Sequence, residues 1–352
     1  MFFTIFSLIL PQKKTSVMTN GKVNTQNCAV IGYGSWATAI VKLLSEGGCC
    51  VRWYIRNPDV LESLREEGRN CKYLRDVEFD RQRLILSDNI DDTVMHADTV
   101  IIAAPSAFIK EFLRPLTVSL SDKFVISAVK GIVPDDYATV VDYLVEHYNL
   151  DPERTGIITG PSHAEEVGRE HLSYLTAVCR SEERAREFGS MFAAPYIRLE
   201  YSTDMEGVEY AAIMKNIYAI AVGLAVGLGY GDNFLAVLIA NCAREMSRFL
   251  DCLFPAERNT QASPYLGDLL VTCYSNYSRN RRLGTLIGRG CTVKSALNEM
   301  TMVAEGYYAA ECIRHISKGT EAETPIADAV YQVLYKGASA RKTMAALTSK
   351  LV

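Results

Sequence analysis

The sequence predicts an α/β protein in which a doubly wound parallel sheet is followed by an all-helical region. Short apolar segments alternate with amphipathic segments from Asn27 onward, and this alternation stops after about Asp204. The remainder reads as helices joined by loops that contain Gly and Ser. We therefore expect two domains, residues 27–204 and 205–352. Residues 1–26 are expected to be a loosely ordered N-terminal extension, with Met18 as an alternative start.

The expected strands are short runs rich in Val, Ile and Ala, as is typical of strands buried on both faces. They comprise residues 28–34, 49–56, 99–106, 124–131, 155–161, 174–180 and 196–201. The amphipathic stretches between them predict helices at 35–46, 58–68, 107–116, 135–148 and 181–194. Near the C-terminus, Thr324 followed by Pro325 predicts the N-cap and first residue of another helix.

The composition argues against several classes of protein. The chain has 352 residues, of which 49% are hydrophobic and 22% charged, and its formal net charge is -4. It has no block of basic residues, so neither nucleic acid nor an anionic membrane is expected as a partner. Its ten cysteines show no C-x-x-C motif and no nearby histidine at metal-ligand spacing. We therefore expect no metal, no disulfide framework and a reducing, cytoplasmic location.

A glycine-rich turn follows the first expected strand and opens the first expected helix. Gly32, Gly34 and Ala37 form a G-x-G-x-x-A array in the segment VIGYGSWATAI. Gly32 permits a tight turn, Gly34 lets the backbone approach a pyrophosphate, and Ala37 lets the helix pack on the strand. Because the array lies in a strand-turn-helix context, it predicts a Rossmann-type dinucleotide site.

The end of the second expected strand bears on the choice between NADH and NADPH. An NAD-specific site commonly has an acidic residue here to bind the ribose 2′-hydroxyl, whereas this chain has Arg56 and Asn57. An arginine can pair with a 2′-phosphate, so we expect NADPH to be preferred and NADH to be tolerated. The alternative is that Arg56 stacks on the adenine or faces solvent.

Lys215 is the only charged residue between Tyr210 and Gly231. An unpaired ammonium in an apolar interior is costly, so such a lysine has a lowered pKa or an anionic partner. Three interpretations are open: the segment crosses a membrane, the lysine snorkels from a core helix to the surface, or it works in a cleft. Lys215, Asn216 and several glycines inside the segment disfavour a membrane span.

Asp268 is the expected partner of Lys215. It lies in the apolar segment LGDLLVTC, where Thr272 follows one helical turn later and is expected to line the substrate site. The alternative is that Asp268 caps a helix, since Gly267 and Asp268 precede an apolar run.

A basic run, SNYSRNRRLG, brings Ser278, Arg279 and Asn280 together. Guanidinium groups bind phosphate in a bidentate manner and hydroxyl and amide donors complete such a site, although an isolated run of this kind is more often a solvated loop. Two loops at expected strand ends add Lys130 and the segment TGPSHAEE. In that segment His163 is a second candidate proton donor, ranked below Lys215 because it could equally begin a helix beside the site.

Together these segments resemble one family, the NAD(P)-dependent sn-glycerol-3-phosphate dehydrogenases. The landmarks occur in the family's order over roughly residues 27–310: GYGSWATA, VKGI, TGPSHAEE, EYAAIMKN, LGDLLVTC, SRNRRLG and VAEG. The resemblance implies a Rossmann-type domain, a helical domain and an active site in the cleft between them. It makes Lys215 the catalytic lysine, with Asp268 beside it.

The resemblance also implies two sets of binding residues. Those expected around the substrate are Lys130, Gly160, Ser162, Asp268, Ser278, Arg279 and Asn280. Those expected around the cofactor are Gly32, Gly34, Ser35, Trp36, Arg56, Tyr73, Lys130, Ala164, Arg279, Val303 and Glu305.

The reaction implied is the reversible reduction of dihydroxyacetone phosphate to sn-glycerol 3-phosphate with NAD(P)H, supplying glycerol phosphate for phospholipid synthesis. The lysine ammonium would stabilise charge on the carbonyl oxygen and donate the proton. The alternatives are a two-domain dehydrogenase of the 3-hydroxyacid or ketopantoate reductase type, and a catalytically silent nucleotide sensor. The expected partners are the small-molecule substrate and a second copy in a homodimer, without membrane insertion.

Overall fold

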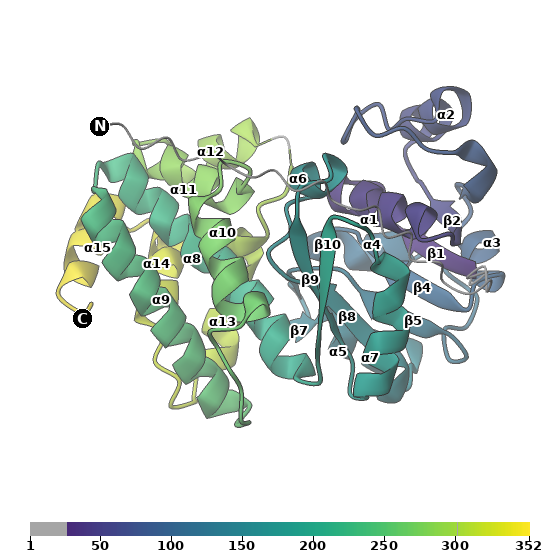
Figure 1. The fold of residues 1–352 in the computed structure, drawn as a ribbon. Coiled ribbons are helices and arrows are strands. Elements are labelled where there is room, and N and C mark those ends of the chain that lie inside the picture. Colours follow the sequence, from purple (N-terminus) through teal and green to yellow (C-terminus); the bar gives the residue numbers. More distant parts are fainter. Residues whose placement is uncertain (1–26, 301) are drawn as a thin grey trace, which may run out of the picture.

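The computed structural model describes residues 27–300 and 302–352. The expected N-terminal extension, residues 1–26, therefore lies outside the described residues. Figure 1 shows a sheet with its helices on one side of the molecule and a bundle of helices on the other. We call residues 27–202 the sheet region and residues 205–352 the helical region, because the last strand ends at Ser202 and a long helix begins at Met205.

Eight strands form the main sheet: β1 (Asn27–Ile31), β2 (Cys50–Tyr54), β3 (Leu84–Ser87), β4 (Thr99–Ile102), β5 (Phe124–Ser127), β8 (Thr155–Thr159), β9 (Ser173–Val178) and β10 (Ile197–Ser202). Their order is β10-β9-β8-β5-β4-β1-β2-β3, so the strand order changes direction between β1 and β4, as in a doubly wound fold. A separate two-stranded ribbon consists of β6 (Ile132–Val133) and β7 (Ala138–Thr139).

Helices cover both faces of this sheet: α1 (Ser35–Glu46), α2 (Pro58–Glu67), α3 (Ile90–Met95), α4 (Ile109–Leu113), α5 (Val140–Tyr148), α6 (Ala164–Gly168) and α7 (Glu182–Gly189). Side chains alternate along each buried strand. In β1, Cys28 and Val30 pack in one core with α1 and α7, whereas Ala29 and Ile31 pack in another core with α4 and α5. All four side chains are fully buried, so the continuous apolar run in β1 is explained by burial on both faces.

The structure corrects the predicted elements in three places. β8 and β9 pair antiparallel, so the sheet is mixed and not all-parallel. Their connection contains only the short α6, and neighbouring strands without a full crossover connection run antiparallel. The edge strand β3 and helix α3 are absent from the predicted elements, because β3 is short and only partly buried. The helix expected at 135–148 begins only at Val140, since the residues before it form the β6–β7 ribbon.

The helical region consists of α8 (Met205–Leu228), α9 (Asp232–Leu253), α10 (Asp268–Tyr274), α11 (Arg279–Gly288), α12 (Val293–Glu299), α13 (Glu305–Ser317), α14 (Pro325–Lys336) and α15 (Ala340–Thr348). The helix α8 is long and apolar enough to cross a membrane by length and composition, but 83% of its most apolar window is buried inside the protein. A helix that is apolar on all sides and buried is a core helix. The membrane interpretation of this segment is therefore wrong.

Helices α8 and α11 cross at very close range because glycines occupy both sides of the contact. A Cβ added to Gly223 of α8 would overlap the backbone oxygen of Arg281, and one added to Gly284 of α11 would overlap that of Ile220. One turn further along, Gly288 repeats the pattern, since its added Cβ would lie 2.5 Å from the backbone oxygen of Leu224. The crossing holds the N-terminus of α11 in a fixed place relative to the middle of α8.

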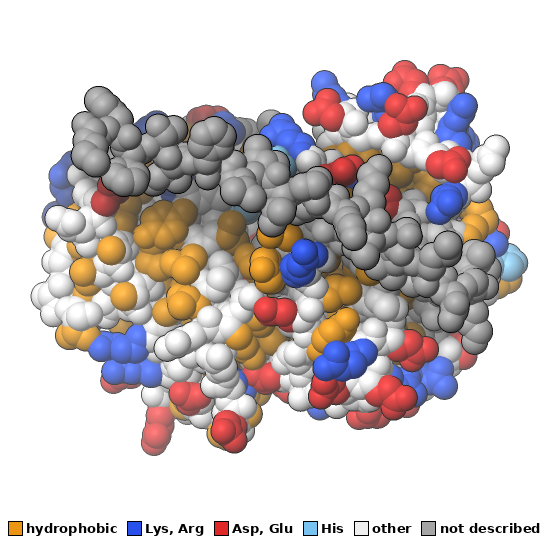
Figure 2. All heavy atoms as spheres, in the orientation of Figure 1, with side chains coloured by type: hydrophobic (Ala, Val, Ile, Leu, Met, Phe, Trp, Pro, Cys, Tyr) orange, Lys and Arg blue, Asp and Glu red, His pale blue; other side chains and the backbone are white. Residues whose placement is uncertain are grey.

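The surface of the helical region has an apolar part. Figure 2 shows acidic and basic side chains mixed over the sheet region, and hydrophobic side chains gathered over the helical region. The large hydrophobic side chains exposed in the helical region include Val237, Leu270 and Tyr274.

Candidate active site

A cavity of about 660 Å³ lies between the sheet region and the helical region. Residues line it from the turn after β1, from the loops after β4, β5 and β8, and from α8, α10 and α11. Doubly wound folds bind their ligands at this edge, outside the carboxyl ends of the strands. All the predicted site residues except Gly32 and Gly160 line this one cavity.

The turn between β1 and α1 has the backbone geometry that its glycines predict. Gly32 has a φ of +126°, and an added Cβ would lie 2.5 Å from the backbone oxygen of Ala103. Gly34 is the N-cap of α1, and a Cβ added there meets no described atom within 4 Å. Because open space lies in front of a helix N-terminus, an anionic group can approach the backbone N–H groups there.

Ser35, Trp36, Tyr73, Ala164 and Val303 also line the cavity. The indole N–H of Trp36 is buried and has no hydrogen-bond partner within the described part of the chain. Buried donors are nearly always paired in native proteins, so a bound ligand is the expected acceptor.

Arg56 lines the cavity and has two neighbours. Its Nη1 lies 2.9 Å from Oε1 of Glu111, and its guanidinium lies 3.9 Å from the centre of the Phe112 ring. Sequence reasoning considers a 2′-phosphate, the adenine or solvent around Arg56, but it misses Glu111. A 2′-phosphate would have to share the Arg56 guanidinium with the Glu111 carboxylate or displace that carboxylate.

Glu305, the first residue of α13, contacts Ser106 in the short helix η2 (Ser106–Phe108). Its carboxylate accepts hydrogen bonds from the Ser106 hydroxyl and, at 3.0 Å, from the Ser106 backbone N–H. Gly131 leaves room for this contact, because an added Cβ would overlap the Glu305 carboxylate. The contact links the helical region to the sheet region at the edge of the cavity.

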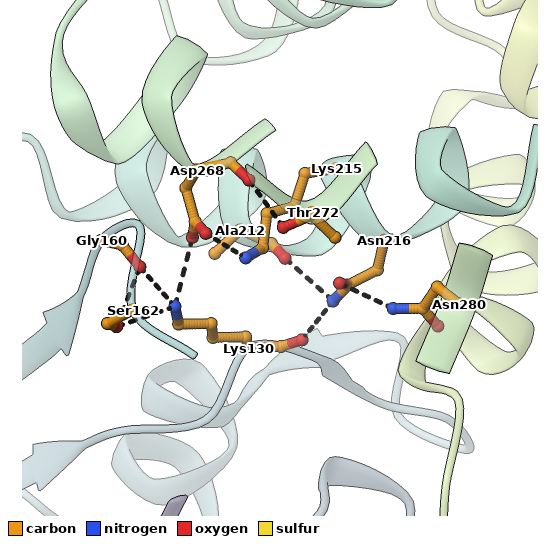
Figure 3. Close-up of polar contacts among 9 residues, drawn as sticks. All are labelled: Lys130, Gly160, Ser162, Ala212, Lys215, Asn216, Asp268, Thr272 and Asn280. Carbon is orange, nitrogen blue, oxygen red and sulfur yellow. Dashed lines mark hydrogen bonds and ion pairs between the residues drawn. The ribbon is translucent and has the colours of Figure 1, made fainter. Parts of the chain in front are cut away.

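Lys215 and Asp268 form a buried ion pair (Figure 3). Lys215 Nζ lies 2.5 Å from Asp268 Oδ1, and the side chains are 5% and 1% exposed. Burial lowers the pKa of Lys215 to about 7, although Asp268 acts in the opposite direction. Burial also opposes ionisation of Asp268, but Lys130 and Lys215 keep its pKa below the usual value. The snorkelling interpretation is therefore wrong, and Lys215 can exchange a proton near neutral pH.

Asp268 is shared by two lysines and does not act as an N-cap, because it has helical backbone angles as the first residue of α10. Lys130 Nζ lies 3.3 Å from Asp268 Oδ2 and donates to the backbone oxygen of Gly160 at 2.6 Å. It also lies 3.5 Å from the Ser162 hydroxyl. Thr272, one turn after Asp268, donates to the backbone oxygen of Asp268 at 2.6 Å. Figure 3 shows these groups facing one another.

The side chains of Ser278 and Asn280 already have partners within the protein. The Ser278 hydroxyl caps α11 by accepting a hydrogen bond from the backbone N–H of Arg281. Asn280 Nδ2 donates to Asn216 Oδ1 at 2.8 Å, and its Oδ1 accepts the backbone N–H of Gly306 at 2.9 Å. The Asn280 amide therefore joins three helices, a structural task that the sequence does not reveal.

Arg279 is the first residue of α11 and is exposed at the cavity. The backbone N–H groups of Arg279 and Asn280, at the start of this 10-residue helix, have no intrahelical partners and favour an anion, whereas that of Arg281 donates to Ser278. Sequence reasoning names the guanidinium but misses these backbone donors. The neighbouring Arg281 and Arg282 do not line the cavity.

Asn216 is a site residue that sequence reasoning misses. It lines the cavity beside Lys215, and its Nδ2 donates to the backbone oxygen of Lys130 at 2.7 Å. Its Oδ1 accepts from Asn280, so it connects α8 with both the β5 loop and α11 (Figure 3). The available signal is a second polar residue inside the same apolar run.

His163 both begins a helix and lines the cavity. It is the N-cap residue of α6, although its side chain makes no capping hydrogen bond. Burial, Lys215 and Lys130 lower its pKa to about 4, against the opposing effects of Asp268 and the backbone of Val271. A ring that is neutral at pH 7 is a poor proton donor, so Lys215 is the better candidate acid.

The fold and the cavity together define a class of protein. A glycine turn at the edge of a doubly wound sheet, facing a buried lysine–aspartate pair, is the arrangement of a nucleotide-dependent dehydrogenase. In residues 27–300 and 302–352, no group of three or more His, Cys, Asp or Glu side chains is placed to hold a metal ion.

Comparisons with known proteins identify the family within this class. Residues 27–185 match the N-terminal model, and residues 204–345 the C-terminal model, of NAD-dependent glycerol-3-phosphate dehydrogenase. The chain belongs to this family, as its sequence landmarks predict. A glycerol-3-phosphate dehydrogenase [NAD(P)+] from Staphylococcus carnosus is 34% identical over 312 residues, covering 88% of this chain and 93% of the relative.

Solved structures agree with this result. The glycerol-3-phosphate dehydrogenase from Coxiella burnetii has a TM-score of 0.84 and 26% identity, covering 92% of this chain and 99% of its own. A Ralstonia solanacearum structure assigned to the ketopantoate reductases has a TM-score of 0.55 and 12% identity, covering 88% of this chain and 96% of its own. The second likeness is in the fold alone, so the family expected from the sequence is confirmed over this alternative.

Proposed function

We propose that this protein interconverts dihydroxyacetone phosphate and sn-glycerol 3-phosphate with NAD(P)H. The observation that carries the proposal is the buried Lys215–Asp268 pair, 2.5 Å apart, in the same cavity as the glycine turn. The proposal also has the support of family membership over most of the chain.

Each of these cavity residues has a distinct role in the proposed reaction. The bound nicotinamide would supply the hydride to the ketone carbon. Lys215, as an ammonium, would stabilise the negative charge that develops on the carbonyl oxygen and then donate its proton to that oxygen. In the reverse direction neutral Lys215 removes the hydroxyl proton. Asp268 orients the amine, and Lys130 holds the other carboxylate oxygen.

The phosphate of the substrate is proposed to bind at the start of α11. Arg279 provides a guanidinium fork, and the helix N-terminus provides backbone donors. Fixing the phosphate orients a three-carbon substrate so that its carbonyl meets both Lys215 and the hydride.

NADPH is proposed as the preferred nicotinamide, with NADH tolerated. The support is Arg56 at the end of β2, where it lines the cavity. Its ion pair with Glu111 limits the preference, because the carboxylate competes with a 2′-phosphate for the same guanidinium.

Further features of the function follow from this proposal. We expect residues 27–204 to act as the cofactor domain and residues 205–352 as the substrate domain, in a cytoplasmic enzyme that supplies glycerol phosphate for phospholipids. Val237, Leu270 and Tyr274 are exposed large hydrophobic side chains of the helical region and are candidate contacts in the proposed homodimer. Light scattering of the purified protein would measure its oligomeric state.

The test is a spectrophotometric assay of NADPH and NADH oxidation with dihydroxyacetone phosphate. Lys215→Met, which keeps the length of the side chain, should lower kcat on the order of 10²-fold or more. Lys350→Ala, at an exposed lysine outside the cavity, is the control and should behave as the natural protein. Near-normal turnover by Lys215→Met, or equal turnover of phosphate-free dihydroxyacetone, would contradict the proposal.

A further inference from the structure

We propose that His163 is a specificity-determining residue whose imidazole hydrogen-bonds the non-reacting hydroxyl of the substrate. This inference rests on the proposed function, because it assigns one more group of dihydroxyacetone phosphate to a residue of the same cavity. It concerns the hydroxyl on the carbon that carries no phosphate.

Most buried polar side-chain atoms that line the cavity have hydrogen-bond partners within the described chain. Only two lining residues in the described chain, Trp36 and His163, have a buried ring nitrogen without a hydrogen-bond partner. Trp36 belongs to the first turn of α1, on the cofactor side. His163 Nε2 is therefore the remaining unsatisfied polar atom near Lys215 and Asp268, and such atoms are usually completed by a ligand.

The other polar side chains in this part of the cavity already donate hydrogen bonds within the protein. The Ser162 hydroxyl donates to the Gly160 backbone oxygen at 3.0 Å, and Thr272 donates to the Asp268 backbone oxygen. Lys130 contacts Gly160 and Asp268. The Val271 backbone already hydrogen-bonds the His163 ring, so Nε2 is the neutral ring nitrogen left without a partner in this part of the cavity.

Each polar group of the substrate has a chemically suited group in the cavity. The phosphate is an anion and suits Arg279 with the α11 N-terminus, while the carbonyl oxygen needs the proton of Lys215. A hydroxyl can donate or accept, so it can pair with the one unpartnered ring nitrogen, Nε2, of a neutral imidazole. His163 is held neutral by burial and by Lys215 and Lys130, which lower its pKa to about 4.

The position of the imidazole is fixed from two sides. His163 is the N-cap of α6 in the sheet region, while its ring lies 5.9 Å, centroid to centroid, from the ring of Tyr277 in the helical region. Tyr277 is held in turn by Arg169, whose Nη1 donates to the Tyr277 hydroxyl at 3.0 Å. A buried ring nitrogen discriminates between substrates because it is left unpaired when the substrate lacks the hydroxyl.

The test compares dihydroxyacetone phosphate with hydroxyacetone phosphate, which has hydrogen in place of the free hydroxyl. The ratio of kcat/KM for the two substrates is measured in the natural protein and in His163→Phe, which keeps a ring without its nitrogens. We expect the ratio to fall on the order of tenfold in His163→Phe. His163→Gln, which restores a donor and an acceptor, should recover part of it. His96→Phe, at an exposed histidine outside the cavity, should leave the ratio unchanged.

Two results would overturn the inference. One is an unchanged ratio in His163→Phe. The other is that His163→Phe changes only the kcat/KM ratio of dihydroxyacetone phosphate to phosphate-free dihydroxyacetone. That result would mean that the imidazole contacts the phosphate. Failure of the proposed function is distinguishable, because the natural protein would then not turn over dihydroxyacetone phosphate at all.

Discussion

Lys215 illustrates how a single residue acquires its chemistry from its surroundings. A lysine in water has a pKa near 10.4 and would be fully protonated at pH 7, so it could donate a proton but hardly accept one. Inside α8, burial lowers its pKa to about 7, and Asp268 keeps it from falling further. A group that titrates near the working pH can serve as acid in one direction and as base in the other.

The first prediction concerns the pH dependence of both directions. In the proposed mechanism the reductive direction uses protonated Lys215, so its kcat/KM should be level at low pH and fall as pH rises through about 7. The oxidative kcat/KM requires neutral Lys215 and should rise through the same range. Asp268→Asn removes the carboxylate that raises the lysine pKa, so both breakpoints should move to lower pH.

Steady-state profiles of the natural protein and of Asp268→Asn measure these breakpoints. Ionisation of the substrate phosphate is common to both proteins and cancels in the comparison. If the breakpoints coincide in the two proteins, a group other than Lys215 carries the proton.

The second prediction concerns Arg56 and Glu111. Glu111→Gln removes the carboxylate that competes for the guanidinium, so NADPH should bind about two- to fivefold more tightly, as expected for a partly exposed ion pair. NADH should bind as before, because it has no 2′-phosphate. Titration calorimetry with each nicotinamide measures the difference. Glu78→Gln, which removes an exposed partner of Arg69, is the matched control. If Glu111→Gln changes the affinities for NADPH and NADH equally, Arg56 does not contact the 2′-phosphate.

At the scale of elements, the crossing of α8 and α11 sets the geometry of the site. Gly223 and Gly284 let the two backbones approach until no side chain fits between them. This approach places Asn280, one residue into α11, within hydrogen-bond distance of Asn216 in α8, at 2.8 Å. The distance between Lys215 and the proposed phosphate site therefore depends on two glycines that do not line the cavity.

The third prediction is made for this crossing. Gly284→Ala adds a methyl group that overlaps the Ile220 backbone oxygen, so the helices must separate. Overpacking of this kind costs about 1–3 kcal/mol of the free energy of unfolding. The KM for dihydroxyacetone phosphate should rise, because Arg279 moves with α11, while the KM for NADPH should change less.

Thermal unfolding and steady-state kinetics measure these effects. Gly231→Ala is the matched control, since its φ of -86° suits alanine and an added Cβ meets no described atom within 4 Å. A Gly284→Ala protein as stable and as active as this control would refute the prediction.

At the scale of the whole molecule, the two regions are joined by polar contacts around the cavity. Lys130 of the sheet region contacts Asp268 of the helical region, and its backbone oxygen accepts from Asn216. Ser106 contacts Glu305 in the same way. Some residues that join the two regions are therefore also proposed to bind the substrate or the cofactor. Ligand binding is expected to strengthen the association of the regions.

The fourth prediction tests this association. Ser106→Ala removes the hydroxyl that donates a hydrogen bond to the Glu305 carboxylate. Hydrogen bonds to charged groups contribute about 1.5–3 kcal/mol to the free energy of unfolding. The Tm should fall by several degrees, and the KM for NADPH should rise because the cavity edge is less well held. Ser119→Ala, at an exposed serine, is the control. Scanning calorimetry with and without NADPH measures both effects, and an unchanged Tm would show that the contact contributes little.

Much of the fold follows from local sequence patterns. The apolar run of β1, the glycine turn after it and the amphipathic α1 are each predictable, because burial on both faces, a positive φ and helical periodicity need particular residue types. Pro325 likewise begins α14 as predicted.

The cap of that helix is not predictable, since Glu245 of α9 accepts hydrogen bonds from the backbone N–H groups of Ile326 and Ala327. The reversed pairing of β9 also depends on contacts distant in sequence.

Local sequence is enough to single out the candidate residues: a lone lysine in an apolar run, an aspartate in an apolar segment, and an arginine in a basic run with Ser278 and Asn280. The tertiary structure alone decided what each contacts. It set the 2.5 Å contact between Lys215 and Asp268, gave Asp268 a second lysine, and occupied the Asn280 amide within the protein. The physical reason is that residue type fixes charge and hydrogen-bonding capacity, whereas pKa and partner depend on burial and on neighbours brought from distant segments.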